Sequence, residues 1–150
     1  MLTPDNHIYT VDRDRLVLER VCQQAGTRTF SPSLTTLHAD FTRPLHLPSM
    51  DGIPPANALH FAAYKQPVLA QLASLLKPGG KLVVVENNTR QGNYAVPIPR
   101  DEGDFLALVR SVGLEAGQIV VRAPPPFWVR CSLTWLALRL WAPLRGCDDW

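Results

Sequence analysis

Residues 75–86, LLKPGGKLVVVE, decide the fold because they join the end of an amphipathic helix to a buried strand. The helix is predicted from Lys65 onward, with Pro67 in its first turn and with apolar side chains at helical spacing: Val68, Leu72, Leu75 and Leu76. The sequence KPGG at 77–80 ends this helix. The run KLVVVE at 81–86 is short and continuously apolar, which is typical of a strand in a sheet covered on both faces.

Strand and helix signals also alternate upstream of this segment. Residues 8–11 form a short apolar run, which predicts a strand. Residues 13–26 predict a helix, with Asp14 as its N-cap and Gly26 as its stop. A second strand, which again ends in an acid, is predicted at 34–40.

The remaining elements continue the same alternation. A strand is expected at Gly52–Ala58, although its double proline weakens it, because proline cannot donate a hydrogen bond to a neighbouring strand. Residues 101–113 predict a helix, and residues 117–124 and 130–140 predict two closing strands that pair antiparallel. The pattern therefore predicts an α/β protein with a mostly parallel sheet and helices on both faces, a three-layer sandwich.

The composition indicates one globular domain over residues 1–150, of which 46% are hydrophobic. The formal net charge is +2, and the 15 basic and 13 acidic residues are interspersed, so no basic patch for nucleic acid is indicated. The three cysteines and four histidines lack the spacing of a disulfide framework or a metal site. We therefore expect no bound metal, and reduced thiols in a cytoplasm.

The apolar stretch at 126–144 is the one segment of the sequence that could be considered as a membrane helix. Arg130 and Arg139 interrupt it and Pro143 closes it, whereas a membrane span needs about 20 mostly apolar residues without such charges. A buried strand is the favoured interpretation. The N-terminus has no long apolar region of the kind that a signal peptide needs, so no membrane attachment is expected.

Polar residues follow the predicted strands at the places where α/β proteins bind ligands. In open α/β sheets, ligands bind outside the carboxyl ends of the strands, and Asp12, Asp40 and Asn57 stand there, with His60 close behind. An acid after one strand can accept hydrogen bonds from both ribose hydroxyls of a nucleoside. An acid after the next strand can accept from an adenine amine, with the neighbouring Phe41 packed on the base.

Each of these residues also has a purely structural interpretation. A strand-end acid such as Asp12 is often the cap of the next helix, and Asp40 can be a turn acid before Pro44. His60 is more often a structural or solvent-facing histidine than a catalyst. Tyr94 could border an acceptor pocket, although a loop aromatic packed on the rim of the sheet is favoured.

The order of these features resembles class I S-adenosylmethionine-dependent methyltransferases, which have a seven-stranded Rossmann-like fold. The matching segments are YTVDRD at 9–14, LHADFTRPLHLPSMDGI at 37–53, ANALHF at 56–61 and LLKPGGKLVVVE at 75–86. The resemblance implies S-adenosyl-L-methionine as cofactor. It implies a cofactor site made of five residues: Asp12 at the ribose with Arg13 beside it, Asp40 and Phe41 at the adenine, and Asn57 near the reactive methyl group.

The sequence departs from the family at its start. The family opens with a strand and a glycine-rich loop, and nothing like them precedes His7, so we expect an N-terminally truncated domain. That strand is central in the family's sheet order, 3-2-1-4-5-7-6. Without it, the strands near residues 8–11 and 53–58 must pair with each other, pair with a strand-donating partner or a second copy, or leave a poorly stable monomer. Weak or absent cofactor binding by this chain is expected.

Two classes of function therefore remain open. The first is methyl transfer to an unknown acceptor, a small molecule rather than a nucleic acid, impaired by the missing loop and with no catalytic residue assigned. The second is a non-catalytic, methyltransferase-like remnant or interaction module that completes its sheet with a partner. A nicotinamide-dependent dehydrogenase also places an acid after its second strand, but the LKPGG turn and the lack of a catalytic Ser/Tyr/Lys set count against it.

Overall fold

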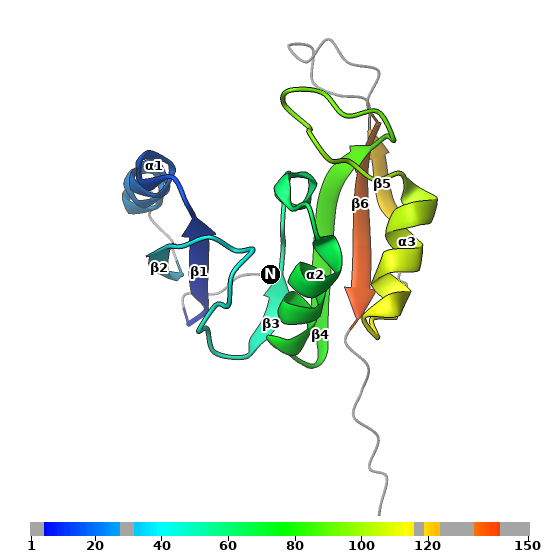
Figure 1. Ribbon diagram of the computed structural model, residues 1–150. Helices are drawn as coiled ribbons and strands as arrows, with labels where there is room; N and C mark the ends of the chain where they lie inside the picture. Colours follow the sequence, from blue (N-terminus) through cyan, green and yellow to red (C-terminus); the bar gives the residue numbers. More distant parts are fainter. Residues whose placement is uncertain (1–4, 28–31, 116–118, 124–133, 142–150) are drawn as a thin grey trace, which may run out of the picture. The chain divides into compact units, whose positions relative to one another are not determined.

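The computed structural model describes residues 5–27, 32–115, 119–123 and 134–141, which divide into two compact units. Unit 1 is Met1–Leu45 and unit 2 is His46–Trp150. Figure 1 shows their elements, in the order β1 (His7–Asp12), α1 (Arg15–Gly26), β2 (Ser33–His38), β3 (Met50–Ile53), the 3₁₀ helix η1 (Leu59–Phe61), α2 (Lys65–Ser74), β4 (Leu76–Asn88), α3 (Glu102–Ser111), β5 (Ile119–Ala123) and β6 (Thr134–Trp141). The parts of the predicted closing strands at 117–118, 124 and 130–133 lie outside the described residues.

Unit 1 is a strand–helix–strand unit. Strands β1 and β2 pair parallel, in register from His7 opposite Ser33 to Asp12 opposite His38. Helix α1 connects them and begins as predicted, because the side chain of Asp14 accepts a hydrogen bond from the backbone N–H of Leu16 at 2.8 Å. Two parallel strands joined by a crossover helix place their carboxyl ends side by side, and this positions the candidate site residues of this unit.

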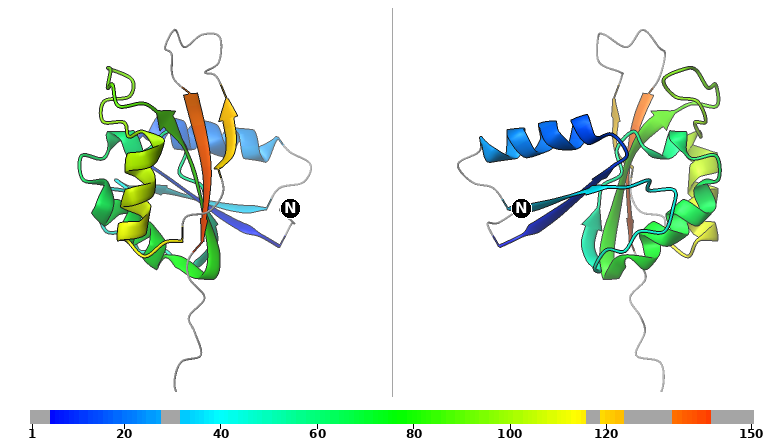
Figure 2. Two further views of the ribbon diagram at one scale, coloured as in Figure 1. Left: turned by 90° about the vertical axis from the view of Figure 1, so that its right-hand side faces the viewer. Right: turned by 60° about the vertical axis from the view of Figure 1, so that its left-hand side comes forward.

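Unit 2 is a four-stranded sheet in the order β3-β4-β6-β5. Strands β3 and β4 are parallel, whereas β6 runs antiparallel to both β4 and β5. The two views of Figure 2 show α2 and α3 on the same face of this sheet. Both units thus combine strands with helices, and the predicted α/β class is confirmed.

The core of unit 2 lies between its helices and strand β4. The largest fully buried side chains of the described residues all belong to this unit: Leu59, Leu69, Leu82, Val84 and Val109. Along β4, Leu82 and Val84 are buried while Val83 and Val85 are only half-buried. A continuously apolar run therefore buries one face of the strand fully and the other partly, rather than both faces equally as the sequence predicts.

The LKPGG segment differs from its prediction in where the helix ends. Helix α2 stops at Ser74, and Leu76 already pairs with Met50 as the first residue of β4. The next paired residues are Gly52 and Lys81, so residues 77–80 form an excursion from the strand. The backbone N–H of Met50 donates to Leu75 O at 2.7 Å, and this long-range bond ends the helix before the apolar periodicity does.

The third strand is shorter and earlier than Gly52–Ala58, the range expected from the sequence. Strand β3 covers only Met50–Ile53 and ends directly before the double proline. Proline has no N–H to donate, so the regular pairing stops there. It resumes only at an isolated bridge between Ala56 and Val85.

Strands β1 and β3 each pair with a single neighbour in the described part of the chain. Among the described residues, β1 pairs only with β2, and β3 pairs only with β4, so the two do not pair directly with each other. In the family's order, 3-2-1-4-5-7-6, these are the two neighbours of the first strand. Within each sheet, β1-β2 and β3-β4-β6-β5, the strand order agrees with the corresponding part of that order.

Candidate functional site

The acids that follow β1 and β2 lie at neighbouring strand ends. Asp12 is paired opposite His38, and its carbonyl accepts a hydrogen bond from the N–H of Ala39 at 3.0 Å, one residue before Asp40. The structure therefore places Asp12 and Asp40 at the same edge of the parallel pair, as the sequence analysis requires of a shared ligand site.

Asp12 holds the turn that leads into α1. Its Oδ1 accepts from the N–H of Asp14 at 2.8 Å, and Asp14 in turn caps the helix. The capping role that the sequence left open for Asp12 therefore belongs to Asp14. Arg13 is exposed between them, and its carbonyl oxygen lies 2.9 Å from Nε2 of His38, which ties the turn to the end of β2.

Asp40 forms a turn of its own. Its Oδ1 accepts from both the hydroxyl and the N–H of Thr42, at 2.7 and 2.9 Å, and Nε of Arg43 lies 3.9 Å from its Oδ2. The two hydrogen bonds from Thr42, with smaller effects of Arg43 and Arg13, hold the pKa of the Asp40 carboxyl below its usual value. Asp40 is therefore a turn acid that stays ionised, beside the half-buried Phe41.

Asn57 belongs to unit 2 and has an unusual backbone conformation. Its φ is 49°, in the left-handed region that residues other than glycine rarely adopt. Its N–H donates to Val85 O at 2.8 Å, and Val85 donates back to Pro55 O at 3.0 Å. Its side-chain Oδ1 is buried without a hydrogen-bond partner among the described residues. Asparagine tolerates this region better than most residues, so the buried acceptor without a partner is the unusual feature of this position.

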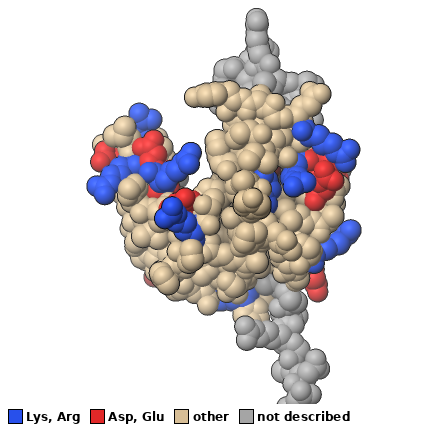
Figure 3. Space-filling model, in the orientation of Figure 1, with Lys and Arg blue, Asp and Glu red and all other residues tan. Residues whose placement is uncertain are grey.

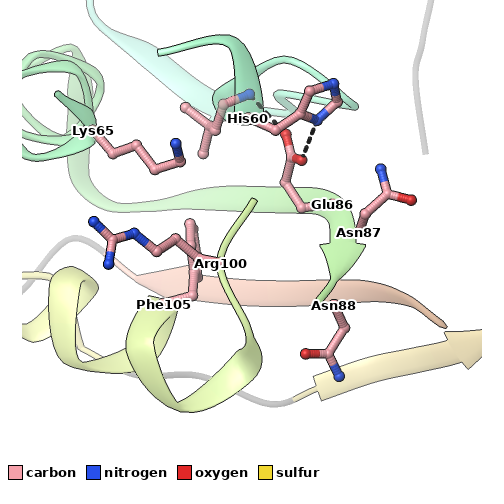
Figure 4. A pocket seen from close by; sticks show the side chains of 8 residues that line it. His60, Lys65, Glu86, Asn87, Asn88, Arg100 and Phe105 are labelled. Atoms are coloured by element: carbon pink, nitrogen blue, oxygen red, sulfur yellow. Dashed lines mark hydrogen bonds and ion pairs between the residues drawn. The ribbon is translucent and has the colours of Figure 1, made fainter. Parts of the chain in front are cut away.

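Glu86, at the end of β4, holds the loop that carries Asn57 and His60. Its Oε1 accepts from the N–H groups of Ala58 and Leu59 at 2.9 and 2.7 Å, and its Oε2 accepts from Nδ1 of His60 at 2.6 Å. Figure 4 shows the carboxylate directed at this segment from the strand. The acid therefore caps η1 and orients the histidine ring at the same time.

Sequence reasoning missed Glu86, although a signal for it was present. It is an acid directly after an apolar strand, the pattern that singled out Asp12 and Asp40. Tyr94, in contrast, packs neither on the rim of the sheet nor against a pocket, because its side chain is fully exposed. The predicted interpretation of Tyr94 as a packed loop aromatic is wrong.

A small, partly open cavity adjoins Glu86 and has a volume of about 10 Å³. Its lining includes His60, Lys65, Arg100 and Phe105, which Figure 4 shows around it. A cavity needs roughly 10–15 Å³ to hold one water molecule. It is therefore no substrate pocket.

Lys65 is buried in this cluster, with only 5% of its surface exposed, and its Nζ donates to Ala62 O at 2.8 Å. Burial lowers the pKa of Lys65, the charge of Arg100 lowers it further, and Glu86 partly opposes both. A lysine at the first residue of α2 also places a positive charge at the positive end of the helix dipole. Burial, the nearby Arg100 and the helix dipole therefore all destabilise the charged ammonium group of Lys65.

We expect Lys65→Met to raise the free energy of unfolding at pH 7 by about 1 kcal/mol, because an apolar side chain needs no desolvation. The unfolded chain binds the lysine proton more tightly than the folded chain does. The wild type therefore gains stability as pH rises from the lowered pKa toward 10.5, and its deficit relative to Lys65→Met shrinks there. Urea unfolding from pH 7 to 10.5 measures this. The exposed Lys77→Met is the control, and a deficit that stays constant with pH contradicts the prediction.

Within the described residues, no group of three or more His, Cys, Asp or Glu side chains is arranged to hold a metal ion. None of the helices in the described part of the chain is long and apolar enough to cross a membrane. Residues 134–141 of the apolar C-terminal stretch form strand β6, as the sequence analysis favours.

Comparison with known proteins identifies the family. The model of a family described as methyltransferase domain matches residues 2–84, more than half of the chain. The chain belongs to this methyltransferase family. The matched range contains Asp12, Asp40 and Asn57 of this methyltransferase chain and ends within β4. No match was found among curated proteins.

Solved methyltransferase structures share the fold at low sequence identity. The N-methyltransferase NodS from Bradyrhizobium japonicum, in complex with S-adenosyl-L-homocysteine, is 15% identical with a TM-score of 0.75, over 91% of this chain and 67% of NodS. A 1,6-didemethyltoxoflavin-N1-methyltransferase from Burkholderia thailandensis is 17% identical with a TM-score of 0.69, over 90% of this chain. A methyltransferase from Methanosarcina mazei is 9% identical with a TM-score of 0.73, over 93% of this chain and 84% of its own.

These comparisons confirm the Rossmann-like methyltransferase fold that the sequence resembles. The chain spans 60% of the length of the Burkholderia protein. The structure brings Asp12, Arg13, Asp40 and Phe41 to one strand edge of unit 1, and it describes Asn57 in unit 2.

Proposed function

We propose that this chain is a methyl-transfer domain that uses S-adenosyl-L-methionine and a small-molecule acceptor. One observation carries the proposal: in a member of the methyltransferase family, Asp12 and Asp40 stand at adjacent carboxyl ends of a parallel strand pair. This is where α/β folds bind nucleotides. The complex of NodS with S-adenosyl-L-homocysteine, a protein of the same fold, supports the choice of cofactor.

The candidate residues suit a nucleoside ligand. The Oδ2 of Asp12 has no hydrogen-bond partner among the described residues and can accept from a ribose hydroxyl, with Arg13 beside it. Asp40, kept ionised, can accept from the adenine amine while Phe41 packs on the ring. In unit 2, the buried Oδ1 of Asn57 has no hydrogen-bond partner among the described residues. When bound, the cofactor supplies a methyl group already activated by its sulfonium.

The proposed binding is weak for this chain by itself. The family's glycine-rich loop, which approaches the methionine half of the cofactor, has no counterpart in the 150 residues. The proposed contacts of Asp12, Asp40 and Phe41 serve only the nucleoside half of the cofactor. We therefore expect a dissociation constant above the micromolar range.

Calorimetric titration with S-adenosylhomocysteine tests the proposal. We expect Asp12→Asn to weaken binding tenfold or more, because a hydrogen bond to a charged group contributes about 1.5–3 kcal/mol. The amide oxygen of asparagine can still accept from the N–H of Asp14, so the turn is kept. Asp51→Asn, which removes the same charge from an exposed side chain, is the control.

Equal affinity of Asp12→Asn and the wild type contradicts the assignment of Asp12. Micromolar or tighter binding by the wild type contradicts the expected weakness. No detectable binding at millimolar ligand contradicts the proposed function itself.

The acceptor is proposed to be a small molecule because charges of both signs are mixed. In Figure 3, basic and acidic side chains lie next to one another in each unit rather than in a single basic patch. Arg90, for example, pairs with both Asp101 and Asp104. Nucleic-acid binding needs a continuous basic surface. A cytoplasmic location belongs to the same proposal, because three cysteines without disulfide spacing suit a reducing compartment.

Within the described residues, β1 and β3 each have one edge without a paired strand. This favours a second candidate, a non-catalytic module that completes its sheet with a strand-donating partner or a second copy. Unpaired edge groups bind an added strand through main-chain hydrogen bonds. Sedimentation equilibrium of the purified chain separates the candidates when combined with the titration. A monomer that binds S-adenosylhomocysteine supports the first, and an oligomer that does not bind it supports the second.

A further inference from the structure

His60 and Glu86 form a buried histidine–carboxylate pair that the nucleoside contacts do not use. The side chain of His60 is only 4% exposed and that of Glu86 12%. The distance from Nδ1 to Oε2 is 2.6 Å, a short, charge-assisted hydrogen bond. His60 lies in η1, three residues beyond Asn57, and Glu86 lies in strand β4.

This bond fixes which ring nitrogen of a neutral His60 carries the proton. A carboxylate can only accept, so Nδ1 keeps its hydrogen and Nε2 is left with a free lone pair. Among the described residues, Nε2 has no hydrogen-bond partner, and Figure 4 shows it on the side of the ring turned away from Glu86. The same Glu86 carboxylate holds the backbone of Ala58 and Leu59, so the ring is mounted on a fixed loop.

Two basic side chains lie near the His60–Glu86 pair. Lys65 from α2 and Arg100 from the segment before α3 line the water-sized cavity together with His60 and Glu86. Lys65 donates to Ala62 O and not to the histidine. Two basic side chains, Lys65 and Arg100, and one acidic side chain, Glu86, therefore lie around the histidine.

We propose that His60 is the general base of this domain and that Glu86 is its positioning residue. This inference rests on the proposed methyl transfer. The acceptor atom forms a bond to the methyl carbon and gives its proton to Nε2, while sulfur keeps the electron pair of the broken carbon–sulfur bond. His60 then releases the proton to solvent. The arrangement matches the way a carboxylate orients a catalytic histidine in hydrolases.

The proposed base defines the class of acceptor. A carboxylate acceptor is already deprotonated near neutral pH and needs no base. A hydroxyl or a protonated amine has to lose a proton as it is methylated. His60 at the end of the loop therefore selects O–H or N–H nucleophiles.

Glu86→Gln and His60→Asn test the base. Glutamine can still accept from Ala58 and Leu59 with its oxygen, but its NH₂ group then faces Nδ1 of His60, so the histidine proton moves to Nε2 and the base is lost. The assay measures S-adenosylhomocysteine release with three probe acceptors. Catechol carries O–H groups, benzylamine carries an amine and benzoic acid carries a carboxylate. Both variants should lower turnover of the O–H and N–H probes by about 10²- to 10⁴-fold. The exposed His46→Asn is the control and should leave it unchanged.

The pH profile separates a base from a structural residue. With the wild type, turnover should fall as pH is lowered through the range where histidines titrate, about pH 5 to 8, and both variants should lose this dependence. Turnover confined to benzoic acid, or unchanged turnover and pH profile in both variants, overturns the proposal.

A second readout is independent of turnover. Long-range ¹H–¹⁵N spectra of the histidine rings should show His60 protonated at Nδ1 in the wild type and at Nε2 in Glu86→Gln. If the spectra place the proton of wild-type His60 on Nε2, the proposal is overturned. This result decides even when none of the three probes reacts. Wild-type chain that does not bind S-adenosylhomocysteine refutes the proposed function instead, whereas binding with an unchanged tautomer in Glu86→Gln refutes only the base.

Discussion

Glu86→Ala is expected to lower the free energy of unfolding of unit 2 by about 3 to 5 kcal/mol, because each buried donor that loses its acceptor costs about 1 to 3 kcal/mol. Alanine leaves three donors without their acceptor: the N–H groups of Ala58 and Leu59 and Nδ1 of His60. Leu59 is completely buried, so water cannot easily replace the carboxylate there. Urea unfolding followed by tryptophan fluorescence measures the loss.

The comparison with Glu86→Gln makes this prediction specific. Glutamine keeps an acceptor for both backbone N–H groups, so we expect it to lose only about 1 kcal/mol, the value of an ordinary hydrogen bond. Glu19→Ala, the same truncation on the exposed surface of α1, is the control and should change stability by less than about 0.5 kcal/mol. If Glu86→Ala unfolds at the same urea concentration as Glu86→Gln, the carboxylate does not hold the loop.

Local chemistry explains which parts of the fold were predictable from the sequence. The helices α1 and α3 begin where Asp14 and Asp101 accept hydrogen bonds from their first turns, and Gly113, with a φ of 75°, follows the end of α3. Each of these signals acts within about four residues. The strand-end positions of Asp12 and Asp40 follow from the same kind of short-range pattern.

Long-range pairing explains the errors. Leu75 and Leu76 continue the apolar periodicity of α2, yet Leu76 pairs with Met50, which is far away in the sequence. The role of Glu86 depends on donors 26 to 28 residues away. A single sequence does not show which residues far apart in the chain are in contact. The sequence therefore pointed to the loop after β3 but not to Glu86, which holds that loop.

Gly80→Ala tests the LKPGG segment from which the fold was first predicted. A Cβ on Gly80 would lie 2.8 Å from Lys77 O, 3.1 Å from Met50 O and 3.3 Å from the Cβ of Leu76. Two of these atoms are backbone carbonyls, held where the strand pairing of Met50 and Leu76 begins. They can move away only if that pairing opens, so we expect a loss of about 2 to 3 kcal/mol, as for an overpacked core.

The matched control for Gly80→Ala is Gly26→Ala at the end of α1. A Cβ there meets no atom within 4 Å, and its backbone is helical, so we expect no loss and a gain of up to about 1 kcal/mol. Urea midpoints with unchanged slopes compare the two variants. If Gly80→Ala is as stable as the wild type, residues 77–80 can rearrange freely. The glycine would then reflect a flexible turn. It would not reflect the tight excursion between the end of α2 at Ser74 and the regular pairing of β4, which resumes seven residues later at Lys81.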